Sequence, residues 1–389
     1  MKLSATARAL SDAISLASAL KTGANSQCVA HLATAENAVS IGCTDKAIGT
    51  IATRLSATIH EPGETAVPAG RLAALACSFP ADAVVEIEVT PRALNVVSGN
   101  SRSRLPVVVL AEVPAAVAIQ SEIGRIEISR ADCLQLLEPL AVADPGRARF
   151  YLAGVFWHSI QDQLVAVSTD GIRLIRTSVA APVFSEDRSL IVPTEVAVAV
   201  RRLLQKADQS QVTIRRSQSL IAFHTHGFSF TARLIDAKFP AYERNIPAPT
   251  SNSVLCDRLK LLAAVSRLSA AAPISDNALV ALSWRHAGRL HLNLARCPLD
   301  GADIVGAEAR GSAELALSLP QFATLLEEFS DDHIRLETAN EQPLVIRAGK
   351  KLALIARSKW NFGRPSAQPT FEMSGALAAS GSSAEIPFP

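Results

Sequence analysis

The sequence predicts an α+β protein made of three tandem domains of similar topology, each with two helices packed on an antiparallel sheet. A short β-type run that meets a proline recurs at Pro68, Pro193 and Pro320, at intervals of about 125 residues. Each proline is followed by a helix-like segment, because proline at a first helical position favours a helix start. β-rich runs lie before and after each of these helices, so consecutive strands can pair antiparallel. Units of this length are whole domains rather than solenoid repeats.

Each unit is also expected to open with an apolar helix. These opening helices are predicted over residues 7–20, 129–142 and 255–269. In the last of them, Leu255, Leu259, Leu262 and Val265 recur at helical spacing, so we expect them to share one face.

β-rich runs follow the second helix of each unit, over residues 84–97, 211–234 and 333–356. Alternation of apolar and polar residues from Val85 to Val89 is typical of a half-buried strand. The first two units also share a Thr-Asp pair, at Thr44-Asp45 and Thr169-Asp170, with the same offset as the prolines. The domains are therefore predicted at 1–121, 122–248 and 249–360. The remaining segment, 361–389, is rich in Ser, Gly, Ala and Pro and predicts a disordered tail.

Composition excludes several classes of protein. Apolar residues make up 49% of the chain but aromatic residues only 5%, so the cores must consist mainly of Ala, Val, Leu and Ile. No uninterrupted apolar run reaches the about 18 residues that a membrane helix needs. The first residues lack the features of a signal peptide. We therefore expect a cytoplasmic protein.

The residue pattern does not predict a catalytic or metal site. The six cysteines are dispersed, and none lies beside a histidine at a zinc-like spacing, so buried free thiols are expected. A phosphate-binding Gly-Lys loop, a Gly-x-Ser-x-Gly elbow and a dinucleotide fingerprint are all missing. Neither a cofactor nor a metal is predicted. As an alternative, an enzyme of unknown type would have to use Asp170 and His158, although Asp170 is also typical of a turn.

One connector carries a family resemblance. The segment Arg233–Pro247 joins a strand end to a proline-fixed connector that keeps aromatic and basic groups together. It resembles the signature connector of the bacterial DNA polymerase III beta subunits, the beta sliding clamps. Three further stretches resemble that family in the same order, at residues 60–69, 149–154 and 168–174. The resemblance runs from residue 1 to about residue 360.

The resemblance implies a ring of two head-to-tail copies whose helices line a central hole for duplex DNA. Such a homodimer is a non-catalytic processivity factor that tethers polymerases to DNA. The implied partners are double-stranded DNA without sequence preference, the DNA polymerase III alpha subunit, the clamp loader and other clamp-binding repair proteins. A diverged clamp-like scaffold or decoy with weakened partner binding is the alternative.

The resemblance also implies a hydrophobic pocket for partner peptides between the second and third domains. It places there Leu152, Thr169, Gly171, Ile172, Arg173, Leu174, Pro240, Arg244, Asn245, Leu354 and Ala356. Ile172 stands where the family often has His, and Asn245 and Ala356 stand where larger apolar residues are common. Losing one such contact would weaken peptide binding by about 1–3 kcal/mol. Plain core packing is the alternative role for Leu152 and Leu174.

Charge favours only loose contact with DNA. The predicted helices together are only slightly basic, which would not support tight binding through phosphate neutralisation. A closed ring is held on DNA by its topology, so it needs only loose contacts with the phosphates. The predicted phosphate contacts are Arg71, Arg201, Arg202, Lys206, Arg258 and Lys260. The alternative for each is a solvated helix face.

Closure of the ring is expected to be weaker than in the family. Relatives place apolar side chains near Ser103 and Arg267, where this chain has a polar and a charged residue.

Overall fold

The structure is a computed structural model. It describes residues 1–20, 28–35, 38–144, 146–181, 184, 189–206, 209–272, 278–285, 288–295, 301–339 and 341–359. Residues 1–358 form one unit by their contacts. The predicted disordered tail, 361–389, lies outside the described residues, as does Cys297.

Nearly the same order of elements occurs three times along the chain, and the first repeat has one additional strand, β5 (Thr58–Glu61). The first repeat consists of β1 (Lys2–Thr6), α1 (Ala7–Ala17), β2 (Val29–Ala35), β3 (Ala38–Asp45), β4 (Gly49–Ser56), β5 (Thr58–Glu61), β6 (Glu64–Pro68), α2 (Ala69–Ser78), β7 (Val84–Thr90), β8 (Ala93–Ser98) and β9 (Ser101–Pro106). Short 3-10 helices, η1 (Ser18–Leu20) and η2 (Leu110–Glu112), follow α1 and β9.

The second repeat has the same plan, with 3-10 helices between its first helix and its second strand. It consists of β10 (Gly124–Ser129), α3 (Arg130–Leu136), η3 (Glu138–Val142), η4 (Arg147–Leu152), β11 (Gly154–Ile160), β12 (Gln163–Thr169), β13 (Arg173–Ala180), β14 (Leu190–Pro193), α4 (Thr194–Lys206), β15 (Gln211–Arg216), β16 (Leu220–His224) and β17 (Phe228–Arg233).

A connector with one 3-10 helix, η5 (Tyr242–Asn245), leads to the third repeat. That repeat consists of β18 (Ser253–Asp257), α5 (Arg258–Ala271), β19 (Leu279–Arg285), β20 (Arg289–Ala295), β21 (Ala302–Arg310), β22 (Ala313–Ser318), α6 (Leu319–Glu327), β23 (His333–Glu337), β24 (Leu344–Ala348) and β25 (Lys351–Ile355). The strand–proline–helix pattern is confirmed, because Pro68 and Pro193 end strands and Pro320 lies in the first turn of α6.

Each repeat opens with a strand, which the sequence interpretation missed. The last residue of that strand caps the following helix: the side chains of Thr6, Ser129 and Asp257 accept hydrogen bonds from the backbone N–H of Ala9, Asp132 and Lys260. Such caps satisfy N–H groups that the first helical turn leaves open. The opening helices therefore start later than expected in the second and third repeats.

The predicted apolar face of the third opening helix is confirmed for Val265, which is buried, and for Leu262, which packs against the core, but it was wrong for the other two residues. Leu255 lies in β18, and Leu259 is 59% exposed. The buried face of α5 consists of Leu261, Ala264, Val265 and Leu268. Apolar residues occur on two adjoining faces of this helix, and the face that carries the small Ala264 is the one that packs in the core.

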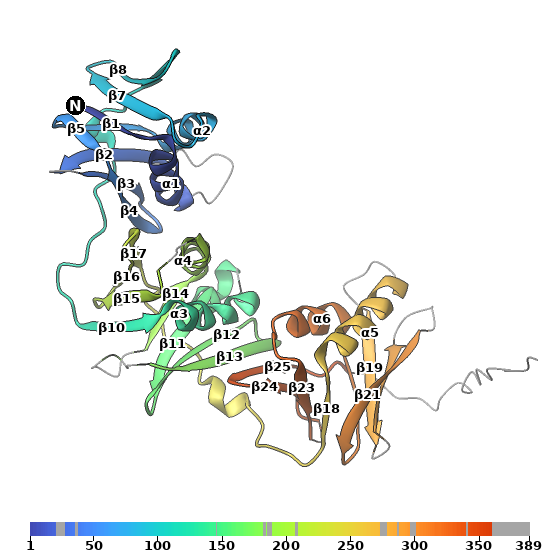
Figure 1. Cartoon of the computed structure of the whole chain (residues 1–389). Coiled ribbons are helices and arrows are strands. Elements are labelled where there is room, and N and C mark those ends of the chain that lie inside the picture. Colours follow the sequence, from blue (N-terminus) through green and yellow to red (C-terminus); the bar gives the residue numbers. More distant parts are fainter. Residues whose placement is uncertain are drawn as a thin grey trace, which may run out of the picture. The chain divides into compact units, whose positions relative to one another are not determined.

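Among the described residues all strand pairs are antiparallel, and they form three sheets (Figure 1). A five-stranded sheet, in the order β5-β1-β7-β8-β9, belongs to the first repeat. An eight-stranded sheet joins the first two repeats through the pair β17–β4, and a twelve-stranded sheet joins the last two through β13–β25. Within each repeat the two helices contact each other. The α+β class, with helices on antiparallel sheets, is confirmed.

The chain leaves each repeat in the same way. Val108 N–H donates to the Ala66 carbonyl, Ile235 N–H to the Ile191 carbonyl and Ser358 N–H to the Ala316 carbonyl. In every case the acceptor lies in the strand that precedes the second helix. The segments that follow the three repeats are therefore structurally equivalent at their start.

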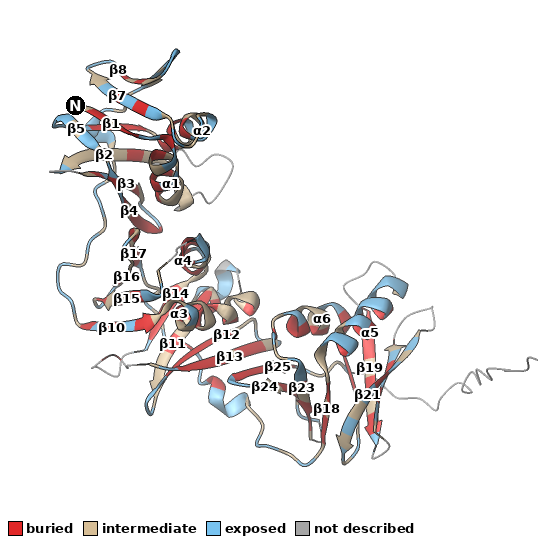
Figure 2. Ribbon diagram, viewed as in Figure 1, coloured by how far each residue is buried: buried red, intermediate tan, exposed pale blue. Residues whose placement is uncertain are grey.

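Buried residues occur along the strands of all three sheets and along the helices, where they are interspersed with exposed ones (Figure 2). Ile48 and Ile51 of the first repeat belong to the core of the second. Cys43, Cys133 and Cys256 are buried free thiols, as expected, whereas Cys77 is exposed and Cys28 half-buried. In the described part of the chain, no helix is long and apolar enough to cross a membrane.

Candidate functional site

A cavity of about 720 Å³ lies where the second and third repeats meet. All eleven residues that the resemblance placed in a peptide pocket line this cavity, so the structure brings them together. Eight further residues line it that were not assigned from the sequence: Arg149, Tyr151, Tyr242, Pro247, Glu341, Gln342, Pro343 and Arg357. The first four lie inside the family-like stretches, so the resemblance could have indicated them. The other four had no comparable signal.

One wall of the cavity is a tight turn between β12 and β13. The Thr169 hydroxyl donates to the Arg173 carbonyl at 2.6 Å, and the Asp170 carboxylate accepts from the backbone N–H of Ile172 and Arg173 at 2.9 and 2.6 Å. Gly171 has φ +88°, and a Cβ there would stand 2.7 Å from Nη1 of Arg149. This turn therefore requires glycine and holds Ile172 outward, 49% exposed, at the rim.

The floor of the cavity is apolar. Leu152, Leu174 and Leu354 are at most 5% exposed, and they belong to one buried cluster with Phe239 and Tyr242. Both roles considered for Leu152 and Leu174 are thus combined, because these side chains pack in a core and line the cavity. Apolar anchors in a concave site with a few polar groups are typical of peptide capture.

The connector that closes the cavity is fixed by aromatic contacts. The rings of Phe239 and Phe156 stack with centroids 4.5 Å apart, and Nε2 of His158 lies 2.8 Å from the Tyr242 hydroxyl. Burial raises the pKa of Tyr242 to about 12, so this hydroxyl stays protonated. His158 thus supports the connector, and Asp170 supports the turn. Each of the two residues considered for catalysis therefore makes a contact that stabilises the fold.

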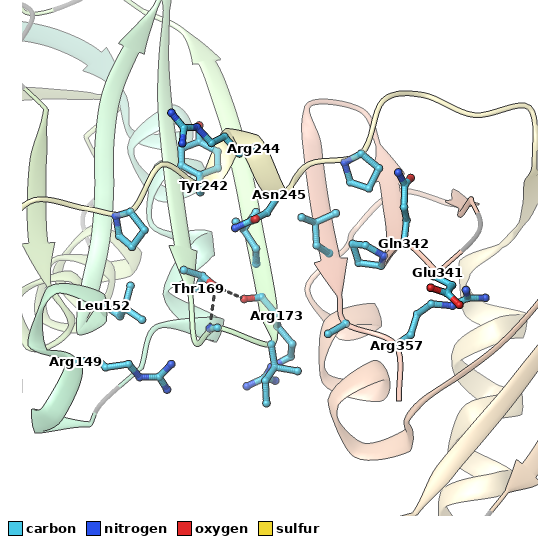
Figure 3. Close-up of a pocket in the computed structure, with 18 of the residues that line it drawn as sticks. Arg149, Leu152, Thr169, Arg173, Tyr242, Arg244, Asn245, Glu341, Gln342 and Arg357 are labelled. Carbon is cyan, nitrogen blue, oxygen red and sulfur yellow. Dashed lines mark hydrogen bonds between the residues drawn. The ribbon is translucent and has the colours of Figure 1, made fainter. Parts of the chain in front are cut away.

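Charged side chains surround the apolar floor (Figure 3). Arg149 pairs with Asp144 at 2.7 Å, and Arg173 pairs with Asp170 at 2.9 Å. Arg357 donates to the Glu314 carbonyl, and burial lowers the pKa of this guanidinium while nearby Glu341 raises it. The cavity therefore combines an apolar floor with a basic, hydrogen-bonding rim.

The six predicted DNA contacts lie on three helices. Arg71 on α2, Arg202 and Lys206 on α4 and Lys260 on α5 are exposed. Three of the six are engaged within the chain. Arg258 donates to the Asp331 carbonyl at 3.0 Å, and Lys260 pairs with Asp257 at 3.8 Å. Half-buried Arg201 counteracts the rise that burial causes in the pKa of Glu328. One donor group of Arg258 is therefore already used within the chain, and nearby carboxylates partly offset the charges of Lys260 and Arg201.

The two residues expected to weaken ring closure lie in the first and third repeats. Ser103 is in β9, the last strand of the five-stranded sheet. Arg267 on α5 is 62% exposed at its side chain and pairs with Asp303 of β21 at 2.7 Å.

The central part of the chain matches the family model described as DNA polymerase III beta subunit, central domain, over residues 138–241. The beta sliding clamp of Pseudomonas putida is 35% identical over 211 residues, 53% of this chain and 56% of that protein. The beta sliding clamp of Escherichia coli K12 is 28% identical over 232 residues, 59% of this chain and 63% of that protein. The chain thus aligns with little more than half the length of these relatives.

Solved structures match nearly the whole chain. A DNA polymerase sliding clamp from Pseudomonas aeruginosa superposes with a TM-score of 0.85 at 24% identity, covering 92% of this chain and all of that one. The sliding clamp from Caulobacter crescentus gives a TM-score of 0.82 at 22% identity, with the same coverage. These likenesses show the same fold in all three repeats.

Proposed function

We propose that this chain, a relative of the bacterial beta sliding clamps, is itself a sliding clamp. Two copies would form a ring around duplex DNA without sequence preference and hold polymerases there through the pocket between the second and third repeats. The action is topological and non-catalytic. The natural division of the chain is into three clamp domains, 1–121, 122–248 and 249–360, and the site of action is the cytoplasm, where replication takes place.

The strand pairing between repeats is the observation that carries this proposal. At both internal junctions the last strand of one repeat pairs with the strand after the Thr-Asp turn of the repeat before it, in the pairs β17–β4 and β25–β13. β9 is the last strand of the first repeat, and β21 is the third-repeat equivalent of β4 and β13. These are the two strands that the pairing between repeats leaves without such a partner. Because β9 ends its sheet, it presents unpaired backbone groups.

The edge of β21 complements that of β9. In the described part of this strand, Ala302–Gly306 pair with β20, and only Ala307–Arg310 pair with β18 on the other side. A second copy can supply β9 to this vacant stretch and receive β9 in return. Two such pairings close a symmetric ring of two chains.

The cavity supports the recruiting role. Its apolar floor and basic rim fit a short linear peptide, which is how the polymerase III alpha subunit, the clamp loader and clamp-binding repair proteins would attach. The exposed basic residues on α2, α4 and α5 would touch phosphates loosely.

Sedimentation velocity at micromolar concentration tests the ring. The wild-type chain should sediment as a dimer. Ile304→Arg puts a cation on exposed β21, opposite the strand that carries Arg102 and Arg104, and should raise the dimer dissociation constant at least about tenfold. Leu259→Arg, at an equally exposed leucine on α5, is the matched control and should stay dimeric. A wild-type monomer at tens of micromolar would contradict the proposal and favour a clamp-like scaffold.

A further inference from the structure

Two cysteines of the first repeat lie in contact. Cys28 directly precedes β2, and Cys43 lies in β3, the strand that pairs with β2 (Figure 1). Ala30 stands opposite Cys43 in this pairing, and residues two apart in an extended chain share a face. The Cys43 thiol hydrogen-bonds to the Cys28 sulfur. Neighbouring segments of the sheet thus hold two thiols against each other.

The two thiols differ in their exposure. Cys43 is fully buried in the core of the first repeat, whereas Cys28 is half-buried and packs against that core. The hydrogen bond to Cys28, and then burial, raise the pKa of Cys43 well above its usual range, so Cys43 stays protonated. Its S–H group therefore donates to the Cys28 sulfur and would stabilise a thiolate there. A reagent in solution meets Cys28 first.

Cys28 also stands at the start of α2. Its carbonyl accepts a hydrogen bond from the Ala69 N–H at 2.9 Å, and Val29 beside it pairs with Pro68. The N-terminal end of a helix carries partial positive charge, which favours a thiolate nearby. The helix end and the Cys43 S–H therefore both favour Cys28 as the attacking sulfur.

The other described cysteines have different neighbours. Burial raises the pKa of Cys256 to about 12, and burial also raises the pKa of Cys133. Exposed Cys77 on α2 has its sulfur 3.0 Å from the Ser11 hydroxyl. Cys77 can thus serve as an accessible control, and the other two as buried ones.

We propose that Cys28 and Cys43 form a reversible disulfide when hydrogen peroxide reaches the chain, and that Cys28 is the sulfur that reacts first. In the first step the Cys28 sulfur attacks one peroxide oxygen and the O–O bond breaks. The leaving hydroxide takes the Cys28 proton and becomes water, so Cys28 is now a sulfenic acid. In the second step the Cys43 sulfur attacks Cys28 and the S–O bond breaks. The leaving hydroxide takes the Cys43 proton as the S–S bond forms.

Overall each sulfur is oxidised by one electron, and one hydrogen peroxide is reduced to two waters. A dithiol reverses the reaction by thiol–disulfide exchange. The bridge ties the start of α2 to β3, because the Cys28 carbonyl holds the first N–H of that helix. Thiol pairs that oxidise reversibly in this way are typical of redox-sensing sites.

Mass spectrometry tests the site directly, because trypsin releases both cysteines in one peptide, residues 22–46. The full chain is treated with one equivalent of hydrogen peroxide, then denatured and blocked with iodoacetamide before digestion. The wild-type peptide should lose both alkylation sites and be two hydrogens lighter than its thiol form. Dithiothreitol, added before the blocking step, should restore both sites. The bridge should form at least about tenfold faster in the folded chain than in urea, because the fold holds the sulfurs together.

Three variants separate the roles of the sulfurs. Cys43→Ala should stop at the sulfenic acid of Cys28, which dimedone traps. Cys28→Ala should leave Cys43 fully alkylated after denaturation. Cys77→Ser is the matched control at the exposed cysteine and should form the bridge as the wild type does.

Thermal unfolding measures the consequence for the fold. The bridge closes a loop of about 15 residues and should raise the Tm of the wild-type chain by about 5 °C. Dithiothreitol should abolish this rise, and Cys28→Ala should not show it. An unchanged or lower Tm of the bridged chain would contradict the stabilising role.

Two alkyl groups on the wild-type peptide after peroxide treatment would overturn the proposal. So would a bridge that forms as fast in urea as in the folded chain, because the fold would then contribute nothing. Oxidation of Cys77 with Cys28 left unchanged would overturn it as well. The wild-type chain gives all three results, so none of them depends on the folding of a variant.

Discussion

Ile48 and Ile172 occupy equivalent positions in two repeats but have opposite surroundings. Each follows a turn in which an aspartate accepts backbone N–H bonds, and each carbonyl accepts a bond from the end of the next repeat, from Arg233 or Ala356. Ile48 is 7% exposed and packs in the core of the second repeat, whereas Ile172 is 49% exposed at the pocket rim. The same junction thus gives an interface in one place and a binding site in the other.

The turns explain the difference. Gly49 at the first junction fits so closely that a Cβ would stand 2.1 Å from the Thr231 carbonyl oxygen. At the second junction Gly171 has φ +88°, and a Cβ there would meet Arg149 of the same repeat rather than a residue of the next repeat. The glycine of the turn is thus in close contact with the next repeat at the first junction and with its own repeat at the second.

The second junction is also held by charge. Lys351, at the start of β25, is 8% exposed; its amino group lies 2.8 Å from the Glu138 carboxylate and 5.4 Å from the centre of the Phe329 ring. At the first junction β17 begins with buried Phe228. A charged contact at the second junction thus contrasts with an apolar one at the first.

The largest expected effect comes from Ile48→Ala. Removal of this buried side chain should lower the free energy of unfolding by about 2–5 kcal/mol, because it leaves a cavity at the first junction. Ile172→Ala is the matched control and should stay within about 0.5 kcal/mol of wild type, as exposed positions do. Urea unfolding measures both. Equal losses would contradict the assigned difference between the junctions.

Binding should show the reverse order. Ile172→Ala removes apolar surface at the pocket rim and should weaken a pocket-binding peptide by about 1 kcal/mol, roughly fivefold. Ile48→Ala should leave peptide affinity unchanged in the folded protein. Fluorescence anisotropy gives both values. If Ile172→Ala binds as well as wild type, the rim has no part in binding.

The smallest effect concerns Glu328, beside Lys351. Burial raises the pKa of this carboxyl in the fold, so the folded chain binds its proton more tightly than the unfolded chain. This group therefore contributes less stability as pH rises from its ordinary value through the raised pKa. Glu328→Gln should raise the Tm at pH 7 by on the order of 1 °C, and the gain should vanish near pH 4. A lower Tm at pH 7 would mean that attraction to Arg201 and Lys351 dominates.

The sequence could predict the repeat and eleven residues of the pocket lining, but neither the contrast between the junctions nor the part of the lining formed by Glu341, Gln342, Pro343 and Arg357. The prolines and the Thr-Asp pairs are local patterns with a fixed offset, and the connector carries its family resemblance in consecutive residues. The opposite fates of Ile48 and Ile172 depend on which strand packs across each junction. The position of Glu341–Pro343 also depends on pairing between repeats, because the pairing of β25 with β13 brings the third repeat to the cavity.

The opening strands were missed for a different reason. Their apolar residues run directly into the opening helices, and a short strand before a helix differs from a helical turn only by its cap, here Thr6, Ser129 or Asp257. Leu255 fitted the helical period of α5 although it lies in β18.

Retention on DNA tests the central claim most directly. The chain, assembled by a clamp loader on nicked circular DNA and passed through a gel-filtration column, should elute with the circle and be released when a restriction enzyme linearises it. Retention by topology predicts this loss, since weak phosphate contacts do not hold an open complex. Equal binding to circular and linear DNA, or to neither, would contradict the assignment of this chain as a sliding clamp.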